Sequence, residues 1–147
     1  MRDQSQTVYR VIDANLNRLR EALRVVEEYV RFSLEDCALS VRLKTMRHEL
    51  RRIEEAAGRE RLLAGRNTAG DPFASENRPE ERRREGLHAI VWANLKRAQE
   101  AARVLEEYTK ITDMAAAADI AKRLRFDAYA IEKQLAEQLD NGEEEKR

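Results

Sequence analysis

Residues 14–29 read ANLNRLREALRVVEEY, and residues 93–108 read ANLKRAQEAARVLEEY. The two stretches agree at 11 of 16 positions, which indicates an internal duplication. The segments that follow also agree when they are aligned with a shift of one residue, pairing Lys44 with Lys122, Arg47 with Arg125 and Ile53 with Ile131. The repeating unit is therefore predicted to be a pair of helices. Six of the eleven matches are polar, and a repeated apolar core does not explain them.

Apolar residues recur every three or four positions in both copies, which is typical of helices with one buried face. In the first copy this stripe comprises Ile12, Leu16, Leu19, Leu23, Val26 and Val30. We expect helices over about residues 7–34, from the cap Asp36 to Gly58, from Pro79 to about Ile111, and from the cap Asp113 to about Asn141. The predicted fold class is all-α, a helical bundle of four long helices from two duplicated hairpins with pseudo-twofold symmetry.

The length of 147 residues suits one domain with a core that can fold unaided. Its parts are predicted as a first repeat at about 7–58, a connecting loop at about 59–78, a second repeat at about 79–140 and a charged tail at 141–147. The connecting loop is rich in Gly, Asn and Pro and poor in core residues. A structureless connection of this length is usually a linker, a lid or a binding loop, and the sequence favours none of these.

Charge and cysteine content exclude several classes of function. Lys plus Arg equals Asp plus Glu at 28 each, so the net charge of zero gives no reason to expect nucleic-acid or membrane partners. The single cysteine, Cys37, cannot form an internal disulfide, and the N-terminus does not resemble a signal peptide. No apolar run approaches the roughly 20 residues of a membrane span. A cytoplasmic location is expected.

Asn15 and Asn94 occupy equivalent places inside the predicted apolar stripes. A buried amide must find partners or cost about 1–3 kcal/mol, so the pair either fixes the register of the helices or lines a polar pocket. Arg18 and Arg97 follow at the border of each stripe. A guanidinium there stays charged only beside a carboxylate or an anionic ligand, and the two roles are equally open. The neighbouring Arg24, Glu27, Arg103 and Glu106 are expected to form ordinary surface ion pairs.

Familiar chemical signatures are missing. The sequence contains no glycine-rich phosphate loop, no zinc-spaced Cys and His set and no nucleophile elbow. His48 and His88 have no second histidine at ligand spacing, which leaves carboxylates as the credible metal ligands. Core or border packing is predicted for Trp92 and for the four tyrosines Tyr9, Tyr29, Tyr108 and Tyr129.

These segments resemble a known family. YRVIDANLNRLREALRVVEEYVRF, LKTMRHEL, RNTAGDPF and ANLKRAQEAARVLEEYTK are together similar to the small all-helical hydroxymethylpyrimidine phosphate kinase family of thiamine biosynthesis, a domain often fused to thiamine phosphate synthase. The resemblance implies ATP- and Mg²⁺-dependent phosphorylation of 4-amino-5-hydroxymethyl-2-methylpyrimidine phosphate to the diphosphate, a small-molecule substrate. Because no synthase barrel follows the last helix, we expect a stand-alone protein that passes its product to thiamine phosphate synthase.

The resemblance also implies roles for the repeated polar residues. The catalytic candidates are Arg18, Arg97 and Asp71. The candidates for binding substrate or nucleotide are Asn15, Asn94, Lys44, Arg47 and Arg66. The candidate magnesium ligands are Glu21, Glu100 and Asp71.

One departure from the family concerns the loop. The family's loop carries Arg-Asp and then Asp-Val-Gly, whereas this chain has Arg66-Asn67 and then Asp71-Pro72-Phe73. Losing a carboxylate at Asn67 weakens a metal site, and Pro72 removes the freedom of a glycine, so the sequence is compatible with a diverged inactive member. The alternative from another class is a non-catalytic helical interaction module, including a homodimer, and a third possibility is a magnesium-dependent all-α nucleotide pyrophosphatase. The duplication allows either one pocket or two.

Overall fold

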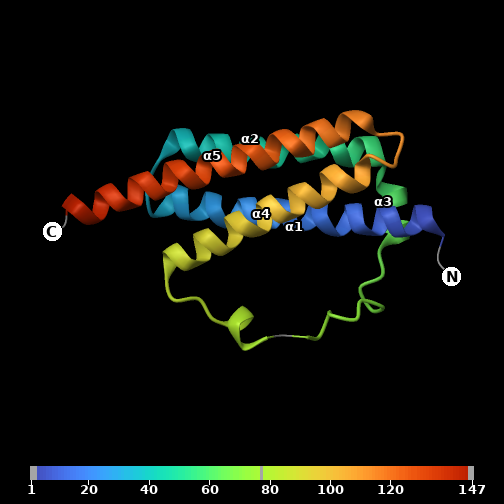
Figure 1. Ribbon diagram of the computed structural model, residues 1–147, viewed down its shortest axis with the longest axis horizontal. Coiled ribbons are helices and arrows are strands. Elements are labelled where there is room, and N and C mark those ends of the chain that lie inside the picture. Colours follow the sequence, from blue (N-terminus) through green and yellow to red (C-terminus); the bar gives the residue numbers. More distant parts are fainter. Residues whose placement is uncertain (1–2, 77, 146–147) are drawn as a thin grey trace.

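The computed structural model describes residues 3–76 and 78–145. In this part of the chain, every regular element is a helix. The elements in order are α1 (Gln4–Phe32), α2 (Cys37–Ala57), α3 (Arg59–Gly65), the short 3₁₀ helix η1 (Pro79–Arg82), α4 (Leu87–Thr109) and α5 (Ala115–Glu145). Figure 1 shows two antiparallel hairpins, α1–α2 and α4–α5, packed into one elongated bundle. The prediction of an all-α bundle is confirmed.

The core lies where the apolar stripes meet. α1 packs along α4 and α2, α4 packs along α5, and α2 touches α5 over a shorter stretch. Every residue of the predicted first stripe is buried. The buried stripes of the other hairpin helices are Leu39, Leu43, Met46, Leu50, Ile53 and Ala57 in α2 and Ala117, Ala121, Leu124, Ala128, Ile131 and Leu135 in α5. Truncating one of these leucines or isoleucines to alanine would cost about 2–5 kcal/mol, because the neighbours only partly fill the cavity.

The turn between α1 and α2 follows from its cap. The Asp36 side chain accepts a hydrogen bond from the backbone N–H of Leu39 at 3.0 Å, as expected for an N-terminal cap. The backbone N–H groups of Ser33 and Leu34 donate to the carbonyl of Tyr29, which closes the end of α1. The two helices thus reverse direction within four residues. This short turn keeps α2 against α1.

Two side-chain contacts recur in both hairpins. Glu27 of α1 accepts from Arg47 of α2 at 2.7 Å, and Glu106 of α4 accepts from Arg125 of α5 at 3.1 Å. Both carboxylates are buried, so each requires its partner. The expectation that Glu27 and Glu106 are surface residues is therefore wrong, because they hold the two helices of each hairpin together. A second recurring contact joins Arg20 to Glu54 and Gln99 to Glu132.

The connecting loop begins later than the predicted residue 59. The first seven residues of the predicted loop form α3, whose Leu62 is buried on the bundle. Gly58, at φ +81°, ends α2 and lets the chain turn, whereas the second repeat continues as one helix at the corresponding position. The irregular connection therefore begins at Arg66.

The third long helix begins later than predicted. Pro79 opens only the four-residue η1, and α4 starts at Leu87 after Gly86. Residues 79–86 read PEERRREG and offer no aliphatic or aromatic side chain to bury, so helix there would gain nothing from the core. Gly86 has φ +134°, a conformation essentially limited to glycine.

The last helix also differs from the prediction. α5 starts at Ala115, so Asp113 is not its cap, and the Asp113 carboxylate instead faces Arg61 at 3.9 Å. The predicted charged tail at 141–147 is helical as far as Glu145, because Leu135 and Leu139 keep α5 packed on the core up to its last turns. Residues 146–147 lie outside the described residues. Across the described ranges, no helix is long and apolar enough to cross a membrane.

Candidate functional site

A pocket of about 590 Å³ lies between α1 and α4. Its lining consists of five residues from each helix: Asn15, Arg18, Glu21, Ala22 and Val25 from α1, and Asn94, Arg97, Glu100, Ala101 and Val104 from α4. Each α4 residue is the repeat counterpart of an α1 residue. The repeated polar residues of the two helices thus line one shared pocket and do not form two separate pockets, one for each repeat.

The antiparallel course of α1 and α4 orders the lining (Figure 1). The Asn15 end of α1 lies beside the Val104 end of α4, and the Asn94 end of α4 lies beside Val25. Glu21 and Glu100 therefore fall nearest the middle of the pocket, with the two arginines next and the two amides at opposite ends. The charges are arranged with approximate twofold symmetry.

The four charged residues of the pocket have no partner among the described residues. Throughout the described residues, Arg18, Arg97, Glu21 and Glu100 make no ion pair and no side-chain hydrogen bond. Neighbours on the same helices behave differently, since Arg24 pairs with Glu28 at 2.7 Å and Arg103 with Glu107 at 3.4 Å. Unpaired guanidinium and carboxylate groups around one pocket are available to a ligand.

The two asparagines have the same geometry. Asn15 is 3% exposed and donates through Nδ2 to the carbonyl of Val11 at 2.9 Å. Asn94 does the same with Ile90, also at 2.9 Å. Because each amide bonds to its own helix, neither links two helices as a register device would. In the described part of the chain their Oδ1 atoms accept no hydrogen bond, which leaves two acceptors at the ends of the pocket.

Four of the predicted site residues lie elsewhere. Arg47 is held by Glu27 between α1 and α2, and Lys44 is exposed on α2. Arg66 donates two hydrogen bonds to the buried Asp13 at 2.8 and 2.7 Å. These bonds and the attraction of the Asp13 charge raise the pKa of Arg66 above its ordinary value. The Asp71 carboxylate accepts from the backbone N–H of Phe73 at 2.9 Å within the connecting loop.

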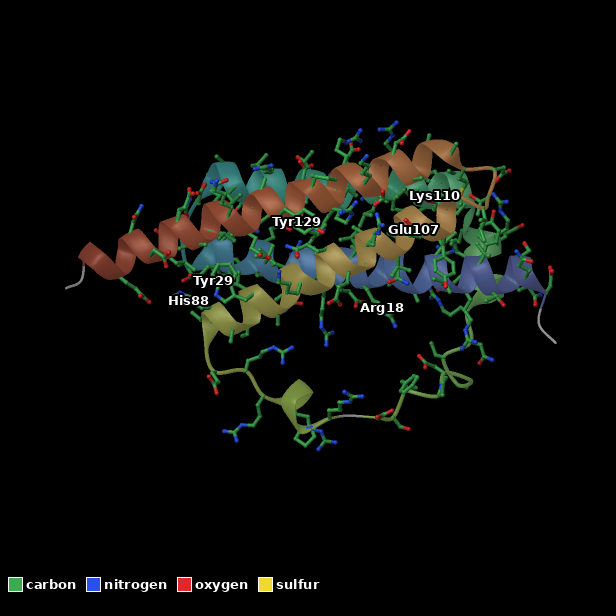
Figure 2. The ribbon with its side chains drawn as sticks, in the orientation of Figure 1. Arg18, Tyr29, His88, Glu107, Lys110 and Tyr129 are labelled. Carbon is green, nitrogen blue, oxygen red and sulfur yellow. The ribbon has the colours of Figure 1, made fainter. Side chains whose placement is uncertain are left out.

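The connecting loop starts at a fixed point on α1. Besides the Arg66–Asp13 pair, Arg10 donates to the backbone carbonyl of Asn67 at 2.9 Å. From there the chain runs along the outside of α1 and α4 to the start of α4 (Figure 1). Figure 2 shows the Arg18 side chain pointing to the side of the bundle on which this loop runs.

The sequence reasoning missed the apolar part of the lining. Ala22 and Ala101 are repeat counterparts, as are Val25 and Val104, and all four face the pocket. Their signal was present in the repeat, because the same small residue follows the repeated glutamate in both copies, where a larger side chain would fill the space between the helices. The alanines leave the room that a ligand needs.

The fold and the site define a class: an all-helical bundle of two matched hairpins with one polar pocket between its central helices. The chain matches the ThiD2 family over residues 10–134 and belongs to that family. This confirms the resemblance to a family of thiamine biosynthesis.

Curated relatives carry the name thiamine-phosphate synthase. The protein of Thermosynechococcus vestitus is 45% identical over 132 residues, which cover 90% of this chain and 36% of the relative. The protein of Nostoc punctiforme is 39% identical over 130 residues, covering 88% and 36% respectively. That of Rhodopirellula baltica is 40% identical over 132 residues, covering 90% and 35%. The chain thus spans about a third of the length of these relatives. No solved structure matches it.

Proposed function

We propose that the protein phosphorylates 4-amino-5-hydroxymethyl-2-methylpyrimidine phosphate to the diphosphate, using ATP. The observation that carries this proposal is the pocket between α1 and α4, in which Arg18 and Arg97 face a common space and have no partner in the described part of the chain. Membership of the ThiD2 family and similarity to thiamine-phosphate synthases give the metabolic context. A synthase of thiamine phosphate consumes such a diphosphate, so the two activities are consecutive.

The chemistry asks for positioning and charge more than for covalent catalysis. In the reaction, a phosphate oxygen of the acceptor forms a bond to the γ-phosphorus of ATP, and the bond from that phosphorus to the β–γ bridging oxygen breaks. Both substrates carry phosphate, and the pocket offers one guanidinium from each half. The phosphates of the two substrates repel each other as they approach. Arg18 and Arg97 would reduce this repulsion by neutralising the charge of the phosphate oxygens.

Mg²⁺ fits the donors that the pocket presents. Glu21 and Glu100 supply hard oxygen ligands near its middle, and the Asn15 and Asn94 amide oxygens lie further out. Among the described residues, no group of three or more acidic, histidine or cysteine side chains is placed to hold a metal. Mg²⁺ commonly takes only one or two protein carboxylates and completes its shell with phosphate oxygens and water. When bound, it would offset the charge of the transferring phosphate.

The remaining candidates receive different roles in this proposal. We assign Arg47 to holding α1 against α2 and Arg66 to anchoring the loop on α1, because both guanidinium groups already have carboxylate partners. Asp71 would contribute only if the loop moved toward the pocket. Lys44 has no part in the reaction.

A coupled assay tests the function. Purified protein, ATP, Mg²⁺ and the pyrimidine phosphate are incubated, and the diphosphate is detected through thiamine phosphate synthase. Product that requires every component supports the kinase. Hydrolysis of nucleotide without the acceptor would instead indicate a pyrophosphatase. A folded protein that neither turns over nor binds nucleotide would favour the helical interaction module.

Arg18→Ala is the decisive variant. We expect turnover to fall by about 100-fold or more, since a charge that stabilises the transferring phosphate is lost. Arg24→Ala is the matched control, because Arg24 lies on the same helix but pairs with Glu28 at the surface. Unchanged turnover in a folded Arg18→Ala protein would contradict the proposed role of the pocket.

A further inference from the structure

Tyr29 and Tyr108 are repeat counterparts, but their side chains differ in exposure and in their contacts. Tyr29 is 9% exposed and meets the ring of His88 edge to face at 6.1 Å between centroids. Figure 2 shows these two side chains next to each other near the start of α4. Tyr108 is 38% exposed. Across residues 3–76 and 78–145, its ring contacts no other ring or cation, and its hydroxyl makes no hydrogen bond. Tyr108 therefore lies at the border of the core, one of the two places predicted for it, whereas Tyr29 lies inside the core.

Tyr108 lies on the pocket face of α4. It follows the lining residue Val104 by one helical turn and Ala101 by two. At about 100° per residue, the five lining residues of α4 span an arc of roughly 120°, and Tyr108 falls inside this arc. Since α1 and α4 are antiparallel, Tyr108 lies one turn beyond the lining residue Val104, at the Asn15 end of the pocket. Its counterpart Tyr29 lies one turn beyond Val25, at the opposite end, where its ring packs on His88.

Two groups at this end suit one kind of ligand. An exposed aromatic ring stacks on a flat heterocycle, and such stacking tolerates different bases because each has a π-face. Asn15, at the same end of the pocket, donates through Nδ2 to the carbonyl of Val11, and its Oδ1 accepts nothing from the described residues, so this oxygen is available to a ligand's amino group. Arg18, one turn from Asn15, is placed for the phosphate of the same ligand.

We propose that Tyr108 and Asn15 form a subsite for an amino-substituted heteroaromatic ring whose phosphate points toward Arg18. The proposal deepens the proposed function and rests on it for the choice of ligands, since both adenine and the aminopyrimidine have this chemistry. At the other end of the pocket the counterpart Tyr29 is buried against His88 and does not expose its ring in this way. One of the two substrates therefore places its ring on Tyr108, and the other is held through its phosphates.

Binding measurements separate the ring from the phosphates. Calorimetric titrations with MgATP, with the pyrimidine phosphate and with Mg-tripolyphosphate would be compared for the wild type, Tyr108→Leu and Tyr108→Phe. We expect Tyr108→Leu to weaken one ring-bearing ligand by about tenfold or more and to leave tripolyphosphate unchanged. Tyr108→Phe keeps the ring and should bind within about twofold of the wild type. The ligand that is weakened identifies which substrate uses the subsite.

Tyr129→Leu is the matched control. Tyr129 is similarly exposed, at 42%, but lies beside Arg125 and Phe126 on α5, a helix that contributes no residue to the pocket lining. Its replacement should change none of the three affinities. Circular dichroism and thermal melting would verify that each variant is folded.

Three results would overturn the inference: wild-type affinity of Tyr108→Leu for both ring-bearing ligands, equal weakening of tripolyphosphate, or no binding of either ring-bearing ligand by the wild type. Failure of the proposed function has a different signature. A wild-type protein that binds a ring-bearing ligand through Tyr108 but forms no diphosphate would refute the kinase and support the subsite.

Discussion

At the scale of single residues, the adjacent glutamates Glu27 and Glu28 differ in burial and in the arginine that each one pairs with. Glu27 is buried and bonded to Arg47 of α2, while Glu28 lies toward the surface and pairs with Arg24 of its own helix. A helical step of about 100° between neighbours is enough to produce this difference. The same division recurs at Glu106 and Glu107. A repeated Glu-Glu pair therefore encodes one interhelical contact and one surface ion pair.

Unfolding measurements on these neighbours test that division. Glu27→Ala should lower the free energy of unfolding by about 2–4 kcal/mol, because it leaves the largely buried Arg47 guanidinium without its carboxylate. Glu28→Ala should change it by less than about 1 kcal/mol, as exposed ion pairs contribute little. Urea titrations followed by circular dichroism give both values. Equal effects of the two substitutions would refute the assignment.

At the scale of elements, α3 and the connecting loop distinguish the first repeat from the second. α3 lies directly on the backbone of α1: a Cβ atom added to Gly65 would come within 2.8 Å of the backbone nitrogen of Arg10. Only glycine permits this approach, because backbone atoms cannot move aside as a flexible side chain does. The contact fixes where the loop begins, next to the Arg66–Asp13 pair.

Gly65→Ala should therefore destabilise the protein by about 1–3 kcal/mol by pushing α3 away from α1. Gly142→Ala is the control, since nothing lies within 4 Å of a Cβ added there and alanine favours helix. Thermal melting of both variants compares them. A Gly65→Ala protein as stable as the wild type would show that α3 is not held by this approach.

Shortening the loop tests whether it serves only as a linker. α4 has 23 residues and is therefore about 35 Å long. Deleting residues 74–82 leaves about 12 loop residues, which can span about 40 Å when extended. We expect the deletion to leave the bundle folded and to lower turnover by about tenfold, because the loop runs on the side to which Arg18 points and could shield the reaction from water.

A variant in which residues 74–82 are replaced by a Gly/Ser sequence of the same length separates length from composition. Loss of turnover in both variants would indicate that the loop's own side chains matter. Full turnover in the shortened protein would make the loop a linker.

At the scale of the whole molecule, the two halves with similar sequences build one pocket because α1 and α4 pack directly against each other. Each half contributes one arginine, one glutamate and one amide to the same space. Two similar hairpins that met through α2 and α5 would have carried these residues on opposite sides of the bundle. The packing order of the helices thus decides the number of sites.

A single shared pocket makes a distinct kinetic prediction. Arg18→Ala and Arg97→Ala should each lower kcat/KM by about 100-fold or more, because both guanidiniums act on one phosphate cluster. Independent pockets would leave each single variant with about half of the wild-type activity, since the other pocket would still work. Steady-state rates from the coupled assay, combined with calorimetric stoichiometry of one MgATP per chain, decide between the two arrangements.

The sequence by itself determined the helical class and the apolar stripes, and its candidate site residues included the six polar residues that line the pocket. These follow from local periodicity and from a repeat that places Asn15, Arg18 and Glu21 on one helix face. Tertiary structure alone decided that the two faces meet, that Arg47 and Arg66 are held by carboxylates, and that Tyr108 is exposed while Tyr29 is covered. Periodicity defines which side of a helix is buried, but the partner of each face depends on packing between distant segments. The sequence also predicted that the third long helix begins at Pro79, whereas α4 begins at Leu87. Residues 79–86 do not extend α4 because they offer no apolar side chains for the core to bury.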